Sequence, residues 1–300
     1  MADQVTPARG RWLVVAAALL WSSSGFFARA PFFSGWPPAG LAFWRAAFAC
    51  LILLPMVRQP RWSWKLLPAV LTFAAMNYTY VTALVEGSPA NAIWMQSTAP
   101  IWVLLAGVWV FHESAHWRDW TLVACCFVGI TLILFFEWRA EQSTVGQGGG
   151  VRAVLYGVAS GLFYAGVVLS LRQLRAFDSA WLVGLNHLTT AVLLGPLAVQ
   201  GNAWPSSGTQ WLLLAGFGMF QMGLPYVLFA RGLRSLPGHE ASGIGLLEPL
   251  LMPVWVLVAW GIWPAWWTMA GAAFILVGLG LKYLGSRPAL PLQPAARDAV

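Results

Sequence analysis

Three ionisable residues lie inside long apolar runs of the sequence and are the first candidates for chemistry. Glu248 lies in the run 241–260, His187 in the run 180–199 and Arg45 in the run 39–57. An ionisable group inside such a run is costly in lipid and typically marks a functional path. A carboxyl and an imidazole can both take up and release protons, so Glu248 and His187 are the candidates for proton coupling.

Polar and aromatic residues gather near the middle of four further runs. With a rise of about 1.5 Å per residue from each helix end, the following fall at a similar depth: Trp21, Ser22, Asn77, Tyr78, Tyr164 and Gln221. Polar groups in hydrocarbon need partners or water, so a shared depth favours one internal cavity lined by these residues. Individual members could instead form interhelical hydrogen bonds.

The run 89–111 adds two further candidates for substrate binding. Trp94 and Thr98 are four residues apart and therefore lie on one face of a helix, together with Asn91, Met95 and Trp102. The centre of this stripe is aromatic, which suits an aromatic or cationic substrate. An ordinary packing seam between helices would have the same pattern.

Depth along the helices also separates the roles of the ionisable residues. Arg45 lies nearer one face of the membrane, and Glu248 and His187 lie nearer the other, so we expect no direct ion pair between Arg45 and Glu248. Glu248 and His187 could pair if their helices are neighbours. Arg45 could bind a substrate carboxylate or extend outward as a structural cation.

The apolar runs that carry these residues identify the class of protein. The chain is 59% hydrophobic and 9% charged, with a mean hydropathy of +0.69, outside the usual range of soluble domains. A helix needs about twenty apolar residues to cross a bilayer core. The sequence therefore predicts an all-α integral membrane protein with ten transmembrane helices, at residues 12–27, 39–57, 66–85, 89–111, 120–136, 151–171, 180–199, 209–230, 241–260 and 265–284.

Lysine and arginine predict the orientation of these helices, because both residues are enriched in cytoplasmic loops. Of the cations in the loops and at the helix ends, only Arg29, Arg139 and Arg152 fall on one side of the predicted topology. Ten helices with both termini in the cytoplasm satisfy this pattern. The net charge of +7 is then a topological signal and implies no nucleic-acid partner.

The first run also resembles a signal peptide, whose cleavage would leave nine helices.

The two halves of the chain resemble one another weakly. At a shift of 149 residues, Pro100 matches Pro249 and Gly129 matches Gly278. Since five helices is an odd number, the second half must enter the membrane from the opposite face, as in the inverted repeats of secondary transporters. We expect repeats at residues 1–137 and 151–285, a linker at 138–150 and a disordered tail at 286–300.

Short motifs point to a known family. They are the segments Leu20-Trp21-Ser22-Ser23-Ser24-Gly25, Phe111-His112-Glu113 and Leu247-Glu248-Pro249-Leu250. With the five-plus-five arrangement, they resemble the drug/metabolite transporter (DMT) superfamily, in its EamA-type branch, over residues 12–284. The sequence is most similar there to bacterial inner-membrane exporters of amino acids, including aromatic ones. The resemblance implies a multi-pass protein of the bacterial inner (plasma) membrane that exports small metabolites by alternating access.

The motifs that are missing narrow the function further. The sequence has no P-loop, H-E-x-x-H or G-x-S-x-G motif, and we nominate no catalytic residue. Cys50, Cys125 and Cys126 lie inside apolar runs and offer neither a disulfide framework nor a metal site, and no cofactor is expected. We expect a secondary transporter of aromatic or apolar amino acids, with multidrug or other metabolite export as the alternative. Its partners are the small-molecule substrate, the lipid bilayer and, as an open question, protons. An intramembrane enzyme would need a nucleophile, a base and an orienting group at one depth, and a channel would favour a ring of repeated charges. The sequence shows neither pattern.

Overall fold

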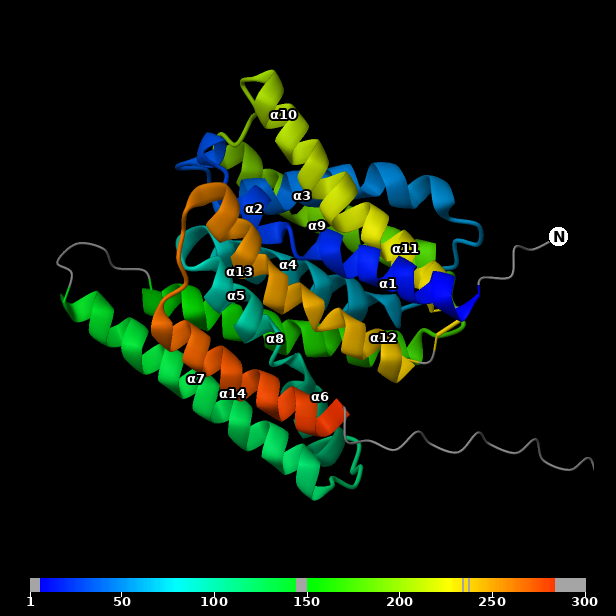
Figure 1. The fold of residues 1–300 in the computed structure, drawn as a ribbon. Helices are drawn as coiled ribbons and strands as arrows, with labels where there is room; N and C mark the ends of the chain where they lie inside the picture. The colour runs from blue at the N-terminus through cyan, green and yellow to red at the C-terminus, as the bar shows by residue number, and fades with distance from the viewer. Residues whose placement is uncertain (1–5, 144–149, 234, 237, 284–300) are drawn as a thin grey trace, which may run out of the picture.

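The computed structural model describes residues 6–143, 150–233, 235–236 and 238–283. Within these residues all regular secondary structure is helical, which confirms the predicted fold class at the level of an all-helical protein. Nine helices of this part of the chain are long and apolar enough to cross a membrane, and the last apolar helix, Trp266–Lys282, is shorter. Most helices run roughly along one direction and form a single bundle (Figure 1).

Each of the ten predicted runs is helical, although several are divided. The first half contains α1 (Pro7–Trp21), α2 (Ser24–Ala28), η1 (Pro31–Phe33), α3 (Pro38–Leu53), η2 (Leu54–Met56), α4 (Leu66–Glu86), α5 (Pro89–Gln96), α6 (Ala99–Trp109) and α7 (Trp117–Ser143). The second half contains α8 (Gly150–Gln173), α9 (Ser179–Gln200), α10 (Gly208–Ala215), the π-helix η3 (Gly216–Gly223), α11 (Leu224–Gly232), α12 (Gly238–Gly245), α13 (Leu247–Trp260) and α14 (Trp266–Tyr283).

The linker between the halves is shorter than predicted. Helix α7 continues to Ser143, so the first part of the expected linker at 138–150 is helical. Glu141 within it accepts a hydrogen bond from the backbone N–H of Val151 at 3.4 Å. Residues 144–149 and the predicted tail at 286–300 lie outside the described residues.

Local sequence signals fix where several helices begin and end. Pro7, Pro38 and Pro89 occupy the first turn of α1, α3 and α5, where a missing N–H costs no hydrogen bond. The Asp178 side chain caps α9 by accepting from the backbone N–H of Ala180 at 2.8 Å. Gly261 ends α13 with φ of 66°, a left-handed conformation that glycine adopts without strain.

The small-residue segments Ser22 to Gly25 and Ser160-Gly161 lie at matched positions of the halves and predict a break in the first and sixth helices. The first break is present, because α1 ends at Trp21 and α2 begins at Ser24. The second is absent, because α8 is continuous through Ser160 and Gly161. A Cβ on Gly161 would lie 2.8 Å from the Met95 carbonyl oxygen. The small residue thus permits close helix packing and does not bend α8.

Two other breaks lie at matched positions of the halves. The fourth predicted helix divides into α5 and α6 immediately before Pro100, and the ninth divides into α12 and α13 two residues before Glu248 and three before Pro249. Proline disfavours a helical conformation in the residue that precedes it and lacks an N–H. The Pro100 and Pro249 pair that aligned the halves in sequence therefore marks a pair of discontinuous helices.

Contacts between the halves hold the bundle together. Helix α4 packs on α8, α3 on α9 and α1 on α11, while α7 and α14 form a pair along one flank (Figure 1). Glycines permit the closest approach in that pair, since a Cβ on Gly129 would lie 2.7 Å from the Gly271 carbonyl oxygen. Backbones can approach this closely only where side chains are small.

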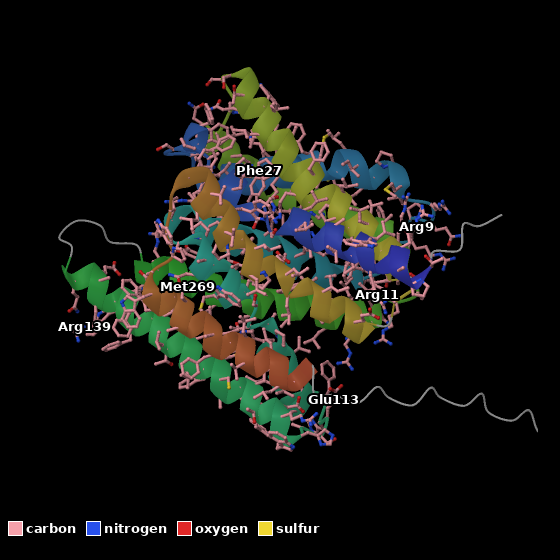
Figure 2. All side chains as sticks on the ribbon, viewed as in Figure 1. Arg9, Arg11, Phe27, Glu113, Arg139 and Met269 are labelled. Carbon is pink, nitrogen blue, oxygen red and sulfur yellow. The ribbon has the colours of Figure 1, made fainter. Side chains whose placement is uncertain are left out.

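The two ends of the bundle are distinct. Arg9, Arg11 and Glu113 lie at one end and Arg139 lies at the opposite end (Figure 2). Helix α1 begins and α14 ends at the same end as Arg11 (Figure 1). At that end Arg11 forms an ion pair with Glu240, and Lys282 contacts Asp119 at 2.9 Å. We refer to it below as the cationic end.

Candidate functional site

Arg45 is the centre of a polar cluster buried between the halves. Its side chain is in the middle of α3 and its residue is only 3% exposed. Nε donates to Gln221 Oε1 at 3.1 Å, Nη1 to Asn77 Oδ1 at 3.3 Å and Nη2 to Met222 Sδ at 3.1 Å. The alternative that Arg45 extends outward to the surface is therefore wrong, because its donors are turned into the bundle by partners from both halves.

Aromatic rings enclose the Arg45 guanidinium. Its carbon Cζ lies 5.0 Å from the centre of the Phe217 ring and 5.6 Å from that of Tyr80, so both rings can contribute cation–π attraction. The Tyr80 hydroxyl is 2.9 Å from the Ser24 hydroxyl at the start of α2. The discontinuity between α1 and α2 thus places a polar side chain beside the cluster.

The π-helix η3 positions Gln221, one of the predicted site residues. A π-helix is rare and is frequent at functional sites, because its extra residue redirects side chains. Gln221 is 1% exposed, and its Nε2 donates to the Trp21 carbonyl oxygen at 3.0 Å while its Oε1 accepts from Arg45. That carbonyl is free because α1 ends at Trp21. One amide therefore joins a helix end to the buried cation.

Glu248 and His187 do not form the pair that was considered from the sequence. His187 is fully buried, its Nδ1 lies 2.8 Å from the Val183 carbonyl oxygen and its Nε2 has no hydrogen-bond partner. Glu248 is half-buried and interacts electrostatically with Arg45. In the part of the chain that the structure describes, these two side chains do not form an ion pair. The absence of a direct Arg45–Glu248 contact agrees with the depth argument.

The remaining predicted residues divide into two groups. Near the cluster, Ser22 accepts from Trp255 Nε1 at 2.8 Å, and the ring of Trp21 packs edge-on to Tyr226 with centroids 5.2 Å apart. Tyr78 on α4 and Tyr164 on α8 form the second group, and Tyr164 interacts electrostatically with Tyr226 of the cavity wall. Tyr78 is half-buried against Tyr156, with centroids 6.3 Å apart, and Tyr164 is 41% exposed.

The aromatic stripe of the fourth predicted helix is part of the core. Trp94 is 2% exposed and its Nε1 has no partner, while Thr98 is fully buried and donates to the Met95 carbonyl oxygen at 2.6 Å. The stripe also supplies Asn91, whose Nδ2 donates to Glu137 Oε1 at 2.7 Å. The packing interpretation thus accounts for Thr98 and Asn91, whereas the unpaired indole N–H of Trp94 has no structural explanation.

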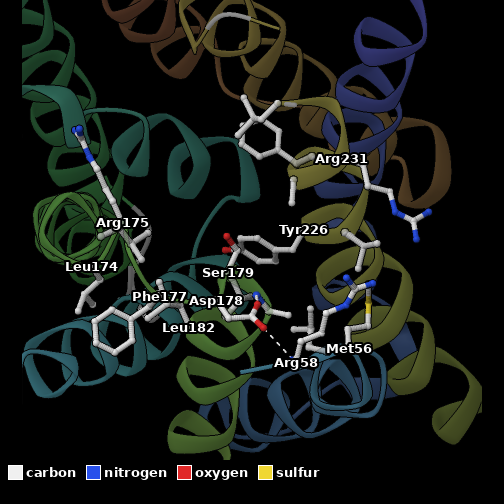
Figure 3. A pocket seen from close by; sticks show the side chains of 18 of the residues that line it. Met56, Arg58, Leu174, Arg175, Phe177, Asp178, Ser179, Leu182, Tyr226 and Arg231 are labelled. Atoms are coloured by element: carbon white, nitrogen blue, oxygen red, sulfur yellow. Dashed lines mark hydrogen bonds between the residues drawn. The ribbon is translucent and has the colours of Figure 1, made fainter. Parts of the chain in front are cut away.

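A cavity of about 890 Å³ opens between the ends of α3, α8 and α11 and the start of α9. Its walls are mainly apolar, and Arg58, Arg175, Arg231 and Asp178 place it at the cationic end. Figure 3 shows Tyr226 between Arg175 and Arg231. Because the Tyr226 ring also contacts His187 and Trp21, the inner wall of the cavity adjoins the polar cluster.

Asp178 organises the mouth of this cavity. Burial opposes its charge, but hydrogen bonds from the backbone N–H groups of Arg58, Ala180 and Gln59 outweigh that effect and lower the pKa of the Asp178 carboxyl. Arg58 N lies 2.9 Å from Asp178 Oδ2 (Figure 3). The carboxylate stays charged at neutral pH and ties the segment after η2 to the start of α9.

Aromatic packing closes the opposite end of the bundle. Trp44 of α3 lies with its ring centroid 5.0 Å from Trp211 and 5.4 Å from Trp204, both from the second half, and donates from Nε1 to the Ala203 carbonyl oxygen at 2.8 Å. Trp260 stacks on Phe26 with centroids 5.2 Å apart. The pocket found near this end, between the start of α5 and the end of α13, has a volume of only about 10 Å³.

Sequence reasoning missed several members of the site. Tyr80 is one helical turn from Asn77 on the same face of α4, a spacing that could have identified it. Tyr226 and Trp255 gave no signal, because each is an aromatic residue in an apolar run and its contacts depend on the other half of the chain. A second, partly buried network was also missed: Glu137 Oε1 accepts from Asn91 and from Trp267.

The fold and the site together define a class of protein: a polytopic, all-helical membrane protein with a polar centre and a cavity that opens at one end. The sequence places it more narrowly. The EamA-like transporter family matches residues 8–135 and again residues 151–284, and the chain belongs to this family. The expected resemblance to the EamA-type branch of the DMT superfamily is confirmed at that level.

Relatives extend over most of the chain. An "Uncharacterized transporter YxxF" of Bacillus subtilis is 24% identical over 282 residues, covering 89% of this chain and 87% of the relative. A "Riboflavin transporter" of Rhizobium johnstonii is 25% identical over 255 residues, covering 80% and 79%. A solved structure titled "Crystal structure of protein" has a TM-score of 0.64 at 16% identity and covers 95% of this chain and 100% of its own, which supports the fold alone.

Replacement of Gln221 by Leu tests the cluster. The variant leaves buried Arg45 Nε without its partner and removes the hydrogen bond to the Trp21 carbonyl oxygen, so we expect a loss of about 1–3 kcal/mol in stability. The measurement is thermal unfolding of purified protein in detergent. Gln210→Leu is the matched control, because half-buried Gln210 bonds the Phe32 carbonyl oxygen at the surface at 2.9 Å. Equal destabilisation by both variants would contradict the central role of Gln221.

Proposed function

We propose that the protein is a secondary transporter that exports small metabolites by alternating access, and that its cargo is an amino acid with an aromatic or apolar side chain. The observation that carries this proposal is the cavity whose inner wall adjoins a polar cluster built by both halves. Secondary transporters bind substrate near the midplane, where their repeats meet. Membership of a transporter family supports the same function.

The proposed architecture is ten transmembrane helices in two inverted repeats, at residues 1–137 and 151–285. Two separate family matches, one in each half, support it. So do the discontinuous helices before Pro100 and before Pro249, since broken helices at corresponding positions accompany substrate sites in such repeats. We place the protein in the bacterial inner membrane with both termini in the cytoplasm, because the cationic end then faces inward.

In the proposed transport cycle, the conformation described above is the inward-open state. The cavity opens at the cationic end, while Trp44, Trp204 and Trp211 close the other end across the two halves. Opening the outer end would separate these rings and bring α3 and α11 together at the cavity. The halves rock about the Arg45 cluster in this proposal.

The aromatic and apolar surroundings of the cluster favour an apolar cargo. Tyr226 lines the cavity and the Trp21 ring packs against it, and such rings stack favourably on aromatic side chains. The cavity is large enough for a wider range of metabolites, and binding sites of about 300–1,000 Å³ accept drug-sized molecules. Export of drugs or other metabolites is therefore the alternative.

A flavin is a second candidate cargo. The observation in its favour is the relative named as a riboflavin transporter, together with a cavity whose volume and aromatic residues suit a planar ring system.

A channel or an intramembrane enzyme is less consistent with the site. Its charged and polar groups, Arg45, Asn77 and Gln221, are bonded to one another and supply neither a ring of charges nor a nucleophile with a base.

Cysteine labelling tests the proposed orientation. Ser179 lines the cavity at the cationic end, and Ser206 is exposed at the opposite end. We expect Ser179→Cys to react with a membrane-impermeant maleimide only from the cytoplasmic side, and Ser206→Cys only from outside. The unmodified chain is the control, since Cys50 and Cys126 are buried and Cys125 is half-buried within α7. The reverse labelling pattern, or one side for both variants, would reject the topology.

Transport by purified protein in liposomes tests the function and the cargo. We expect saturable counterflow of radiolabelled phenylalanine or tryptophan, because a carrier exchanges bound cargo without a gradient. The panel includes riboflavin, a polar amino acid and protein-free liposomes. Substitution of Trp94 or Tyr78 by Ala is expected to change the apparent affinity for the cargo several-fold. Unchanged kinetics in both variants would remove these two residues from the substrate site. Flux that never saturates would indicate a channel, and a chemically altered solute would indicate an enzyme.

Glu248 is our candidate for the proton carrier. The titratable or charged groups that interact with it electrostatically are Arg45, Tyr80 and Tyr226. We expect Glu248→Gln to abolish stimulation of transport by a pH gradient and to keep counterflow, since the amide cannot release a proton. Glu113→Gln is the control, because Glu113 pairs with Arg172 near the surface at 3.1 Å. Full gradient-driven transport by Glu248→Gln would remove the carrier role, and His187 would then be tested in the same way.

A further inference from the structure

The buried guanidinium of Arg45 has only neutral hydrogen-bond acceptors. Two of its nitrogens donate to the side-chain amides of Gln221 and Asn77, and the third donates to the Met222 thioether, which is a weak acceptor. Among the described residues no carboxylate forms an ion pair with it. Glu248 interacts with Arg45 only electrostatically, without such contact.

Such an arrangement favours the binding of an anion. A guanidinium presents a planar fork of donors that matches a carboxylate, and these bidentate contacts are much stronger than bonds to neutral acceptors. A buried cation without a bonded counter-ion is also costly to maintain. A carboxylate that replaced Gln221 or Met222 as the acceptor would relieve that cost.

An unpaired donor beside Arg45 points to the same ligand. Asn77 is fully buried, and while its Oδ1 accepts from Arg45, its Nδ2 has no hydrogen-bond partner. Buried amide N–H groups are almost always satisfied in proteins. The amide of Asn77 therefore holds a free donor next to a cation that lacks an anion.

Gln221 links this pair to the wall of the cavity through Trp21. Its amide lies between Arg45 and the carbonyl of Trp21, and the ring of Trp21 packs on Tyr226 in the cavity wall. A ligand that entered beside Tyr226 would reach Arg45 along these contacts, past Trp21 and Gln221. Rotation of one neutral side chain would open the guanidinium to it.

We propose that Arg45 and Asn77 bind the carboxylate of the transported amino acid, with Gln221 holding the place of that carboxylate in the empty state. This inference rests on the proposed function and adds to it the group that recognises the cargo. The side chain of the cargo would face the aromatic residues Trp21 and Tyr226.

The first test needs no mutation. Binding of phenylalanine, phenylalaninamide and phenethylamine to the native protein in nanodiscs is measured by calorimetry. Loss of a charge-assisted, bidentate contact is expected to weaken the amide and the amine by about 10- to 100-fold relative to phenylalanine. Equal binding of the three compounds would overturn the Arg45 site alone, whereas no binding of any amino acid would overturn the proposed cargo.

Asn77→Asp is the decisive variant, because it changes few atoms and supplies a carboxylate to Arg45 from within. We expect it to fold with unchanged or higher thermal stability and to lose at least tenfold in phenylalanine affinity, since the guanidinium is already occupied. If Arg45 had only a structural role, Asn77→Asp would leave the affinity for phenylalanine unchanged. That result would overturn the proposal.

Substitution at Arg45 completes the test with a matched control. Arg45→Lys keeps the charge and loses the fork, so we expect weaker binding of phenylalanine and little change, within about threefold, for phenylalaninamide. Arg29→Lys is the control, because Arg29 donates from Nη1 to the Val85 carbonyl oxygen at 2.7 Å outside the cluster. Equal losses for the acid and the amide in Arg45→Lys would contradict carboxylate recognition.

Discussion

The constraint on which the structure depends is that a cation buried between membrane-spanning helices must be solvated by the protein. Arg45 is 3% exposed. The chain meets this requirement with amides from two other helices, Asn77 on α4 and Gln221 on η3. Polar groups in hydrocarbon are tolerated only where such partners exist. Helices of both halves must therefore keep their register around this one side chain.

Interruptions of the helices make that solvation possible. The end of α1 at Trp21 frees a carbonyl oxygen that accepts from Gln221, and the π-helix η3 directs Gln221 toward Arg45. The restart of the chain at α2 supplies Ser24 to the Tyr80 hydroxyl. In lipid an unpaired backbone group costs several kcal/mol, so a helix can break only where polar side chains meet the exposed groups. The irregular segments and the polar cluster thus depend on each other.

Much of the fold follows from local sequence, whereas the site does so only in part. Length and hydropathy locate all ten helical runs, because a span is set by bilayer thickness. Depth brought Asn77 and Gln221 to one level, and the structure joins both to Arg45. Depth could not tell which face of a helix a residue occupies, so it did not separate fully buried Asn77 from Tyr164, which is 41% exposed. The helix break predicted at Gly161 is absent for a related reason. Small residues occur both where helices bend and where they pack closely, and the sequence does not distinguish the two.

The asymmetry of the two ends gives the cluster a mechanical role in the proposed cycle. At one end, apolar rings of both halves pack around Trp44, while at the other the cavity reaches Tyr226. Helix α3 contains both Trp44 and Arg45, so a tilt of α3 that separates the rings must also shift the guanidinium. A ligand that replaced Gln221 on Arg45 would require the Gln221 side chain to rotate, and that rotation would also break its hydrogen bond to the Trp21 carbonyl oxygen at the end of α1. Occupancy of the site and the position of α1 would then be coupled through a single amide.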